Sequence, residues 1–189
     1  MTDLRVLRAA DRPAAPWKNG GGVTREIAAW PESAGIDDFV WRVSLADVTA
    51  DGPFSVFPGV DRTLTVVEGA GMELDVGGRQ HLVDVRDTPR RFPGDVPTAG
   101  RLLDGPVVNL NVMHRRDRGG IAVLVSVVRG GLPLLVPAGS TVLVVALDAP
   151  ARLVSARVTL DRYDVAVATG WPGVLETEGR AAVVTIRHP

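Results

Sequence analysis

The sequence has no cysteine in its 189 residues. This absence excludes disulfide frameworks, thiolate metal sites and cysteine nucleophiles. It also suits a reducing compartment, so we expect a cytoplasmic protein. A chain of this length buries roughly 70% of the surface that its unfolded state exposes. We therefore expect a core that forms without covalent or metal cross-links.

Long apolar runs are also missing. No stretch approaches the ~18 uncharged apolar residues that a membrane helix requires, and the start, MTDLRVLRAADRPAAPW, carries charges throughout and has no signal-peptide apolar region. The 21 basic and 22 acidic residues nearly cancel, and the four tryptophans are scattered. A basic stripe with aromatic interleaving is therefore absent, and we expect neither a membrane nor a nucleic-acid partner.

The motifs of several catalytic classes are absent as well. The three histidines, His81, His114 and His188, are far apart and form no H-x-H or H-E-x-x-H pattern, so we expect no bound metal and no cofactor. No G-x-S-x-G supports an acyl-transfer serine, and neither the phosphate-loop nor the dinucleotide fingerprint occurs. The sequence therefore assigns no catalytic residue, and a non-enzymatic role is favoured.

What the chain does have is dense punctuation, with 21 glycines and 14 prolines between short runs rich in valine, leucine and threonine. No long window holds an apolar period of 3.6 residues, and one short turn near Ser44 to Thr49 is the best helix candidate. The main runs predicted as strands are 39–48, 62–68, 72–76, 107–113, 121–128, 141–147, 152–160, 164–169 and 181–186. Many short strands at even spacing predict an all-β sandwich or barrel.

A charged, glycine-ended segment from Arg115 to Gly120 separates two halves that weakly echo each other. Both LTVVEGAGMELDVGG and VLVVALDAPARLVSA read as strand, small-residue turn and strand. This repetition predicts a duplicated jelly-roll-like barrel, with residues 1–118 as the first barrel and 119–189 as the second. Exchange of strands between the two halves remains open.

Two of the predicted strands have one polar face. In WRVSLADV, Arg42 and Ser44 alternate with apolar residues, and in VVNLNVM, Asn109 and Asn111 do the same. Asparagine is a poor strand residue, so two in register indicate a need for amide donors and acceptors. The polar faces either meet solvent or line a cavity, and the sequence leaves both possibilities open.

The segment WKNGGGVTRE places an indole, an ammonium and an amide before three glycines. Such glycines either allow a ligand to approach the backbone closely or serve a bulge or packed strand crossing. In the first case Lys18 supplies a charge, Asn19 a donor and an acceptor, and Trp17 an apolar wall. Arg62 is a further candidate, and its alternative role is a salt bridge to Asp61 or another carboxylate.

These segments resemble the HutD/Ves family of cupin-like proteins, which is associated with bacterial histidine utilisation. The resemblance rests on PWKNGGGVTREIA, DFVWRVSLADVTADGPFSVFPGVDRTLTVVEG, FPGD and LLDGPVVNLNVM, within about residues 16–113. It implies a bicupin without the usual cupin metal ligands and a regulatory, ligand-binding role, with formylglutamate as the proposed ligand. By motif position it implies these pocket residues: Trp17, Lys18, Asn19, Arg25, Arg42, Ser44, Arg62, Asn109 and Asn111.

The sequence therefore allows three functions. The favoured one is a metal-free protein that binds a small anionic metabolite such as N-formylglutamate and acts in regulation through a partner that the sequence does not reveal. The alternative is a cupin-type enzyme acting on a small carboxylate, with Lys18 as general base and an arginine stabilising an oxyanion. A structural module that dimerises through exposed strand edges, giving a homodimer, is compatible with both.

Overall fold

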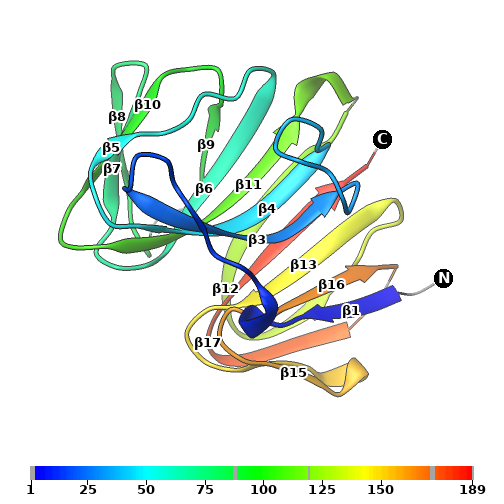
Figure 1. The fold of residues 1–189 in the computed structure, drawn as a ribbon. Helices are drawn as coiled ribbons and strands as arrows, with labels where there is room; N and C mark the ends of the chain where they lie inside the picture. Colours follow the sequence, from blue (N-terminus) through cyan, green and yellow to red (C-terminus); the bar gives the residue numbers. More distant parts are fainter. Residues whose placement is uncertain (1–2, 87–88, 119, 171–172, 189) are drawn as a thin grey trace. The chain divides into compact units, whose positions relative to one another are not determined.

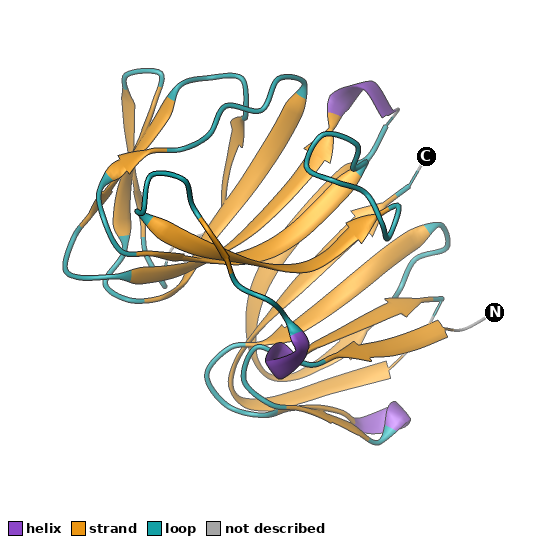
Figure 2. Cartoon of the chain, in the orientation of Figure 1, coloured by secondary structure: helices purple, strands orange, loops and turns teal. Residues whose placement is uncertain are grey.

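The computed structural model describes residues 3–86, 89–118, 120–170 and 173–188. The chain is all-β: strands joined by loops make up most of it (Figure 2), and helix in the described residues is limited to the short 3-10 turns η1 (Ala9–Asp11), η2 (Arg116–Arg118) and η3 (Val154–Ala156). The chain divides into two compact units, residues 13–118 and residues 1–12 with 119–189. Each unit is described separately below.

The first unit contains two antiparallel sheets. The larger has the strand order β2-β3-β4-β11-β6-β9, and the smaller has the order β5-β10-β7-β8 (Figure 1). The strands are β2 (Ala15–Pro16), β3 (Gly22–Trp30), β4 (Trp41–Val48), β5 (Gly52–Pro53), β6 (Val60–Glu68), β7 (Met72–Val76), β8 (Arg79–Val83), β9 (Arg90–Pro93), β10 (Thr98–Leu102) and β11 (Val107–Arg115).

On the inner face of the larger sheet, the side chains change from mainly polar to apolar along the strands. Because side chains alternate across a strand, every second residue of β4 and β11 lies on this face. From one end to the other these residues are Arg42, Ser44, Ala46 and Val48 on β4, and Met113, Asn111, Asn109 and Val107 on β11. Val48 and Val107 join a buried cluster with Met72 and Leu74 of the smaller sheet. On this face, Val48 and Val107 therefore lie in the apolar cluster at one end, and Arg42, Ser44, Asn109 and Asn111 lie toward the other end, where Met113 belongs to a second buried cluster with Phe39 and Val60.

The second unit is built on one sheet with the order β1-β16-β13-β17-β14-β15, in which β12 also pairs with β17. Its strands are β1 (Asp3–Leu7), β12 (Ala122–Leu134), β13 (Ser140–Ala146), β14 (Ala151–Leu153), β15 (Val158–Leu160), β16 (Val165–Thr169) and β17 (Gly173–Arg187). Its main core cluster is apolar, with Val142, Val144, Leu153 and Leu175 buried together.

Residues 1–12 group with the C-terminal half of the chain, although the sequence places them in a first barrel of residues 1–118. The reason is the antiparallel pairing of β1 with β16, in which Asp3 lies opposite Thr169 and Leu7 opposite Val165. The connection between the halves runs through η2, and Gly119 lies outside the described residues.

The strand predictions were right in kind and differ in length. The strand predicted over 72–76 is confirmed, whereas the run 152–160 is interrupted by η3 and the run 181–186 is the end of the longer β17. The helical turn predicted near Ser44 to Thr49 is wrong, because residues 44–48 belong to β4, which is hydrogen-bonded to β3 and β11 on its two sides. Pairing on both edges overrides the weak local helix preference.

Candidate functional site

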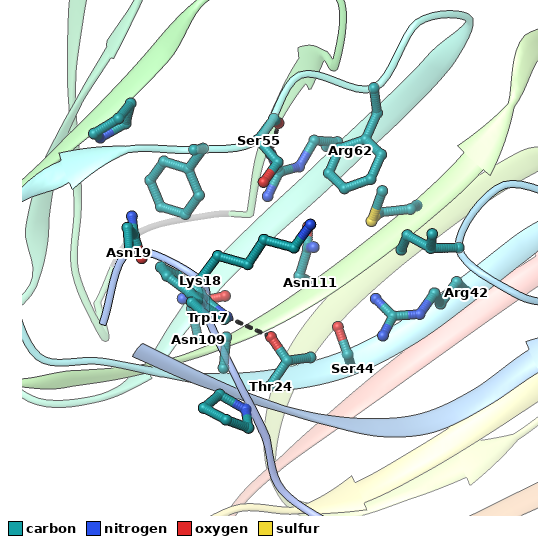
Figure 3. A pocket seen from close by; sticks show the side chains of 17 residues that line it. Trp17, Lys18, Asn19, Thr24, Arg42, Ser44, Ser55, Arg62, Asn109 and Asn111 are labelled. Atoms are coloured by element: carbon teal, nitrogen blue, oxygen red, sulfur yellow. Dashed lines mark hydrogen bonds between the residues drawn. The ribbon is translucent and has the colours of Figure 1, made fainter. Parts of the chain in front are cut away.

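A cavity of about 560 Å³ opens on the polar end of the first unit. Its floor is the inner face of β4, β11 and β6, and its wall is the loop that precedes β3 (Figure 3). Eight of the nine residues predicted for a pocket line it: Trp17, Lys18, Asn19, Arg42, Ser44, Arg62, Asn109 and Asn111. The polar faces of the two strands therefore line a cavity and do not simply face open solvent.

Strand register sets the floor of the cavity in rows. Met113 lies opposite Arg42 on β4 and opposite Arg62 on β6. In the next row Asn111 lies between Ser44 and Leu64. Adjacent strands are about 4.8 Å apart, so the Cα atoms of Arg42 and Arg62 are roughly 10 Å apart. The register thus presents two cationic side chains on either side of a strand that carries two amides.

Arg62 is a buried cation, with 5% of its surface exposed. No carboxylate forms an ion pair with it in the part of the chain that the structure describes, so the salt bridge to Asp61 considered above does not form; Asp61 pairs instead with Arg116. Its Nη1 donates to the carbonyl oxygen of Ser55 at 3.4 Å, and its buried Nε has no partner among the described residues. Burial lowers the pKa of Arg62 to about 10, so the group stays charged at neutral pH.

Arg42 has a different environment. Its Nε donates to Oε2 of Glu26 at 2.6 Å, and the two side chains form an ion pair on neighbouring strands. Glu26 lies opposite Ser44 in the pairing of β3 with β4, which brings its carboxylate to the edge of the cavity floor. The positive charge of Arg42 is therefore largely compensated within the protein.

The two asparagines leave complementary groups unpaired. Asn109 and Asn111 are both buried. Within the described chain, the Nδ2 donor of Asn109 and the Oδ1 acceptor of Asn111 have no hydrogen-bond partner. An unpaired buried polar atom costs free energy unless a ligand or water satisfies it. The floor therefore offers one amide donor and one amide acceptor to whatever fills the cavity.

The loop before β3 is held in place by short contacts. Trp17 donates from its indole Nε1 to Thr24 Oγ1 at 2.7 Å (Figure 3), and its backbone N–H donates to the Gly22 carbonyl at 2.9 Å. A Cβ on Gly22 would lie 2.5 Å from the Asp47 carbonyl oxygen. Gly20 has a φ of +70°. These glycines thus serve strand packing and a left-handed turn, and the residues before them form the cavity wall.

Arg25 does not line the cavity. Thr24 takes the inward position on β3, so its neighbour Arg25 points to the opposite face by alternation. There Nη1 of Arg25 forms an ion pair with the Asp47 carboxylate. The pairing of β3 with β4 places Arg25 opposite Leu45.

Sequence reasoning missed several lining residues. Met113 lies two residues after Asn111 on the same face of β11, so strand alternation could have predicted that it lines the cavity. Phe54, Ser55 and Phe57 line the cavity from the loop between β5 and β6. Loop residues follow no strand periodicity, so no pattern in the sequence indicates which of them point inward.

In the described part of the chain no three histidine, aspartate or glutamate side chains come close enough to hold a metal ion. The histidines lie on separate elements: His81 on β8, His114 on β11, and His188 beside Thr141, whose Oγ1 is 3.0 Å from its Nε2. None of the described helices is long and apolar enough to cross a membrane.

Comparison with known proteins identifies relatives of this chain. The HutD family model matches residues 9–184. The chain is 39% identical over 118 residues to an uncharacterised 21.2 kDa protein in the hutC 3' region of Pseudomonas putida, covering 62% of each protein. It is 41% identical over 108 residues to protein Ves of Citrobacter koseri, covering 56% of this chain and 55% of Ves. These matches span less than two thirds of the relatives' own lengths.

Solved structures extend the similarity to nearly the whole chain. HutD from Pseudomonas fluorescens SBW25 superposes with a TM-score of 0.85 at 31% identity, covering 99% of this chain and 100% of that one. A cupin 2 conserved barrel domain protein from Leptotrichia buccalis, at 13% identity and a TM-score of 0.57, covers 89% of each chain and shares the fold alone. The fold is thus cupin-like, and the resemblance drawn from the sequence motifs is confirmed. The chain belongs to the HutD family.

Proposed function

We propose that this protein binds a small anionic metabolite of histidine breakdown, of the N-formylglutamate type, without a metal, and takes part in regulating that pathway. In this proposal the two units are the two barrels of a bicupin, and the first carries the site. The observation that carries the proposal is Arg62, a charged, buried side chain that lines the cavity and has no carboxylate partner in the described chain. Buried charges are normally paired, so a ligand anion is the expected counter-ion.

The charge of the cavity favours a ligand with two negative charges. Arg42 and Glu26 compensate each other. Arg62 and Lys18 then remain as two positive charges, and Lys18 extends from its loop over the pocket (Figure 3). Arg62 can hold a carboxylate through two parallel hydrogen bonds, and Lys18 acts on a second carboxylate as a point charge.

The unpaired amide atoms favour an acylated amine between the two carboxylates. A secondary amide has one carbonyl acceptor and one N–H donor that point in opposite directions. The free Nδ2 of Asn109 suits the acceptor, and the free Oδ1 of Asn111 suits the donor. N-formylglutamate combines two carboxylates with such an amide.

The relatives point to the same pathway. One is described by its place in the hutC 3' region, and the HutD structure of Pseudomonas fluorescens is described as a formate condition. Formate is the smallest carboxylate, and an arginine can hold a carboxylate through two parallel hydrogen bonds. Both descriptions concern those proteins, and they support the proposal for this chain through family membership.

Calorimetry and thermal melting with a matched ligand set test the proposal. N-formylglutamate should bind more tightly than glutarate, which lacks the amide, and more tightly than N-formylglycine, which lacks the second carboxylate. At a hundredfold excess over its dissociation constant, the ligand should stabilise the protein by about 2.7 kcal/mol. Absence of any shift with N-formylglutamate, urocanate, histidine or formate at millimolar concentration would contradict the proposal.

Two variants refine this test. Lys18→Gln should weaken the binding of N-formylglutamate and leave that of N-formylglycine nearly unaffected, because only the second carboxylate uses the ammonium group.

Incubation of the same metabolites with and without divalent metal ions, followed by mass spectrometry, examines the enzymatic alternative. A product that forms with the wild-type protein and disappears in Lys18→Ala would replace binding by catalysis.

A further inference from the structure

Three aromatic rings surround the Arg62 guanidinium. Its Cζ lies 5.2 Å from the ring centroid of Phe54, 5.6 Å from that of Phe57 and 5.2 Å from that of Phe92. The rings come from separate places: Phe54 and Phe57 from the loop between β5 and β6, and Phe92 from β9, where it lies opposite Arg62 in the sheet. We call Phe54, Phe57 and Phe92 the aromatic cage.

The cage stabilises the cation in a way that a carboxylate does not. The face of an aromatic ring attracts a guanidinium through its quadrupole, most strongly when the pair is desolvated, and it adds no negative charge. A carboxylate would attract Arg62 too, but it would neutralise the charge and accept its hydrogen bonds. Arg62 therefore keeps its full charge, and its one hydrogen bond among the described residues is to Ser55.

Arg42 provides the comparison within the same cavity. It lies in the same row of the sheet, opposite the same residue, yet its Nε already donates to Glu26. An incoming anion must compete with that carboxylate. At Arg62 no such competitor exists among the described residues, and the three rings lie beside its guanidinium.

We propose that the aromatic cage stabilises the charge of Arg62 while no anion is bound and positions Arg62 for anion recognition. Phe54, Phe57 and Phe92 are then positioning residues that act through Arg62 and set the affinity of the pocket for a carboxylate. The inference rests on the proposed anion-binding function and deepens it. In this inference, the residues around each arginine decide whether it is already paired, as Arg42 is with Glu26, or can bind an anion, as Arg62 can.

The cage can be tested without knowing the metabolite, with formate as the probe and the Arg62 Nε–H signal in ¹⁵N NMR as the readout. The signal is assigned by its loss in Arg62→Lys. In the wild-type protein without ligand, ring currents should move it upfield, and burial should slow its exchange with water. Added formate should shift it in a saturable way.

Phe57 offers the matched pair of variants, because it is half-buried at the cavity and packs against the small cluster of Phe39, Val60 and Met113, outside the core cluster that contains Phe92. Phe57→Leu should weaken formate binding about 3- to 30-fold, the range from a partly exposed to a desolvated cation–π contact, and move the signal toward its exposed position. Phe57→Tyr should restore both. Val56→Ala, at an exposed neighbouring residue, controls for changes in the loop.

A purely structural role would lower the melting temperature of Phe57→Leu and leave formate affinity and the Arg62 signal as in the wild type, and that result would overturn the cage. A wild-type Arg62 signal that does not respond to formate would overturn it as well. If the Phe57 variants change formate affinity as expected but N-formylglutamate binds no more tightly than formate, the role of the aromatic cage is supported and the proposed metabolite is wrong.

Discussion

Arg42 and Arg62 lie opposite the same residue, Met113, on the two strands that flank β11. They differ in what surrounds them, since Glu26 pairs with Arg42 and aromatic rings enclose Arg62. By strand register alone, the two arginines occupy equivalent positions in the sheet. Their neighbours make one of them part of an ion pair and leave the other without a carboxylate partner among the described residues.

Replacing Arg62 by methionine separates stability from binding. The change removes a buried charge that has no carboxylate partner in the described chain, and methionine fills much of the same volume. We expect Arg62→Met to be as stable as the wild type or more so in urea unfolding, because desolvation disfavours the charge. Carboxylate affinity should fall at least tenfold, since a hydrogen bond to a charged group contributes about 1.5–3 kcal/mol.

The control for this variant is Arg42→Met, which breaks an ion pair at the cavity edge. It should weaken carboxylate binding less than Arg62→Met does. An Arg62→Met protein that melts well below the wild type and still binds formate would show that Arg62 is needed for folding and not for ligand recognition.

The three consecutive glycines should tolerate substitution unequally. A Cβ on Gly22 would meet the Asp47 carbonyl at 2.5 Å and the Trp17 ring at 3.1 Å, whereas one on Gly21 would meet the Asn19 side chain at 3.4 Å. We expect Gly22→Ala to lower the free energy of unfolding by roughly 1–3 kcal/mol, the usual cost of overpacking, and to move Trp17. Gly21→Ala should change it little.

Gly20 presents a third case, because its φ is +70° and a Cβ added there would have no atom within 4 Å. Gly20→Ala should cost about 1 kcal/mol through backbone strain, and Gly20→Asn less, because asparagine tolerates left-handed angles. Denaturant unfolding and tryptophan fluorescence measure all of these variants. Equal effects at the three positions would show that the loop is not held as described.

Much of the fold could be predicted from the sequence because β alternation is local. The parity of Asn109 and Asn111 against Leu110 and Val112 predicts which side chains share a face, and the structure confirms it. The same reasoning could not place residues 1–12, because a strand's distant partner, here β16, leaves no local signal.

The site shows the same limit. Alternation indicates that Arg42 and Ser44 share a face, and the structure brings them to one cavity with Asn109. In β3, however, alternation does not say whether Thr24 or Arg25 points inward, and this depends on the pairing of β3 with β4. Phe54 lies in a loop, where position depends on contacts that are distant in the sequence.

His114 should make the stability of the protein depend on pH. It is buried on the face of β11 opposite the cavity, with Nδ1 unpartnered among the described residues and Nε2 3.9 Å from Asp61 Oδ2. Burial lowers the pKa of His114, Arg91 and Arg116 lower it further, and Asp61 opposes the shift. The unfolded state, with a histidine pKa of about 6.5, therefore binds the proton more readily than the folded state.

It follows that the free energy of unfolding is unaffected by this group above about pH 6.5 and falls as the pH drops below that value toward the lowered folded-state pKa. Urea unfolding at a series of pH values between 5 and 8 measures the slope. His114→Gln should flatten it, and His81→Gln, on the partly exposed β8, serves as the control. An identical slope in His114→Gln would assign the effect to other groups.

Asp164 should hold the N-terminal segment on the second unit. Its carboxylate accepts hydrogen bonds from Arg8 Nη1 at 2.6 Å, from the Ala9 N–H at 2.7 Å and from the Asp161 N–H at 3.1 Å. Burial alone would raise the pKa of Asp164, but these bonds together hold it below its ordinary value. The carboxylate is thus stabilised in its charged form at the point where β1 ends.

We expect Asp164→Asn to lower the free energy of unfolding by about 1–3 kcal/mol, because it weakens charge-assisted bonds at a buried position. The loss should be local, so amide hydrogen exchange over β1 should accelerate more than exchange over β13. Asp161→Asn removes the same charge from the same loop at an exposed side chain and should leave β1 protected. Unchanged protection of β1 in Asp164→Asn would contradict this prediction. It would mean that the pairing of β1 with Val165–Thr169 of β16 holds β1 in place without the hydrogen bonds of Asp164.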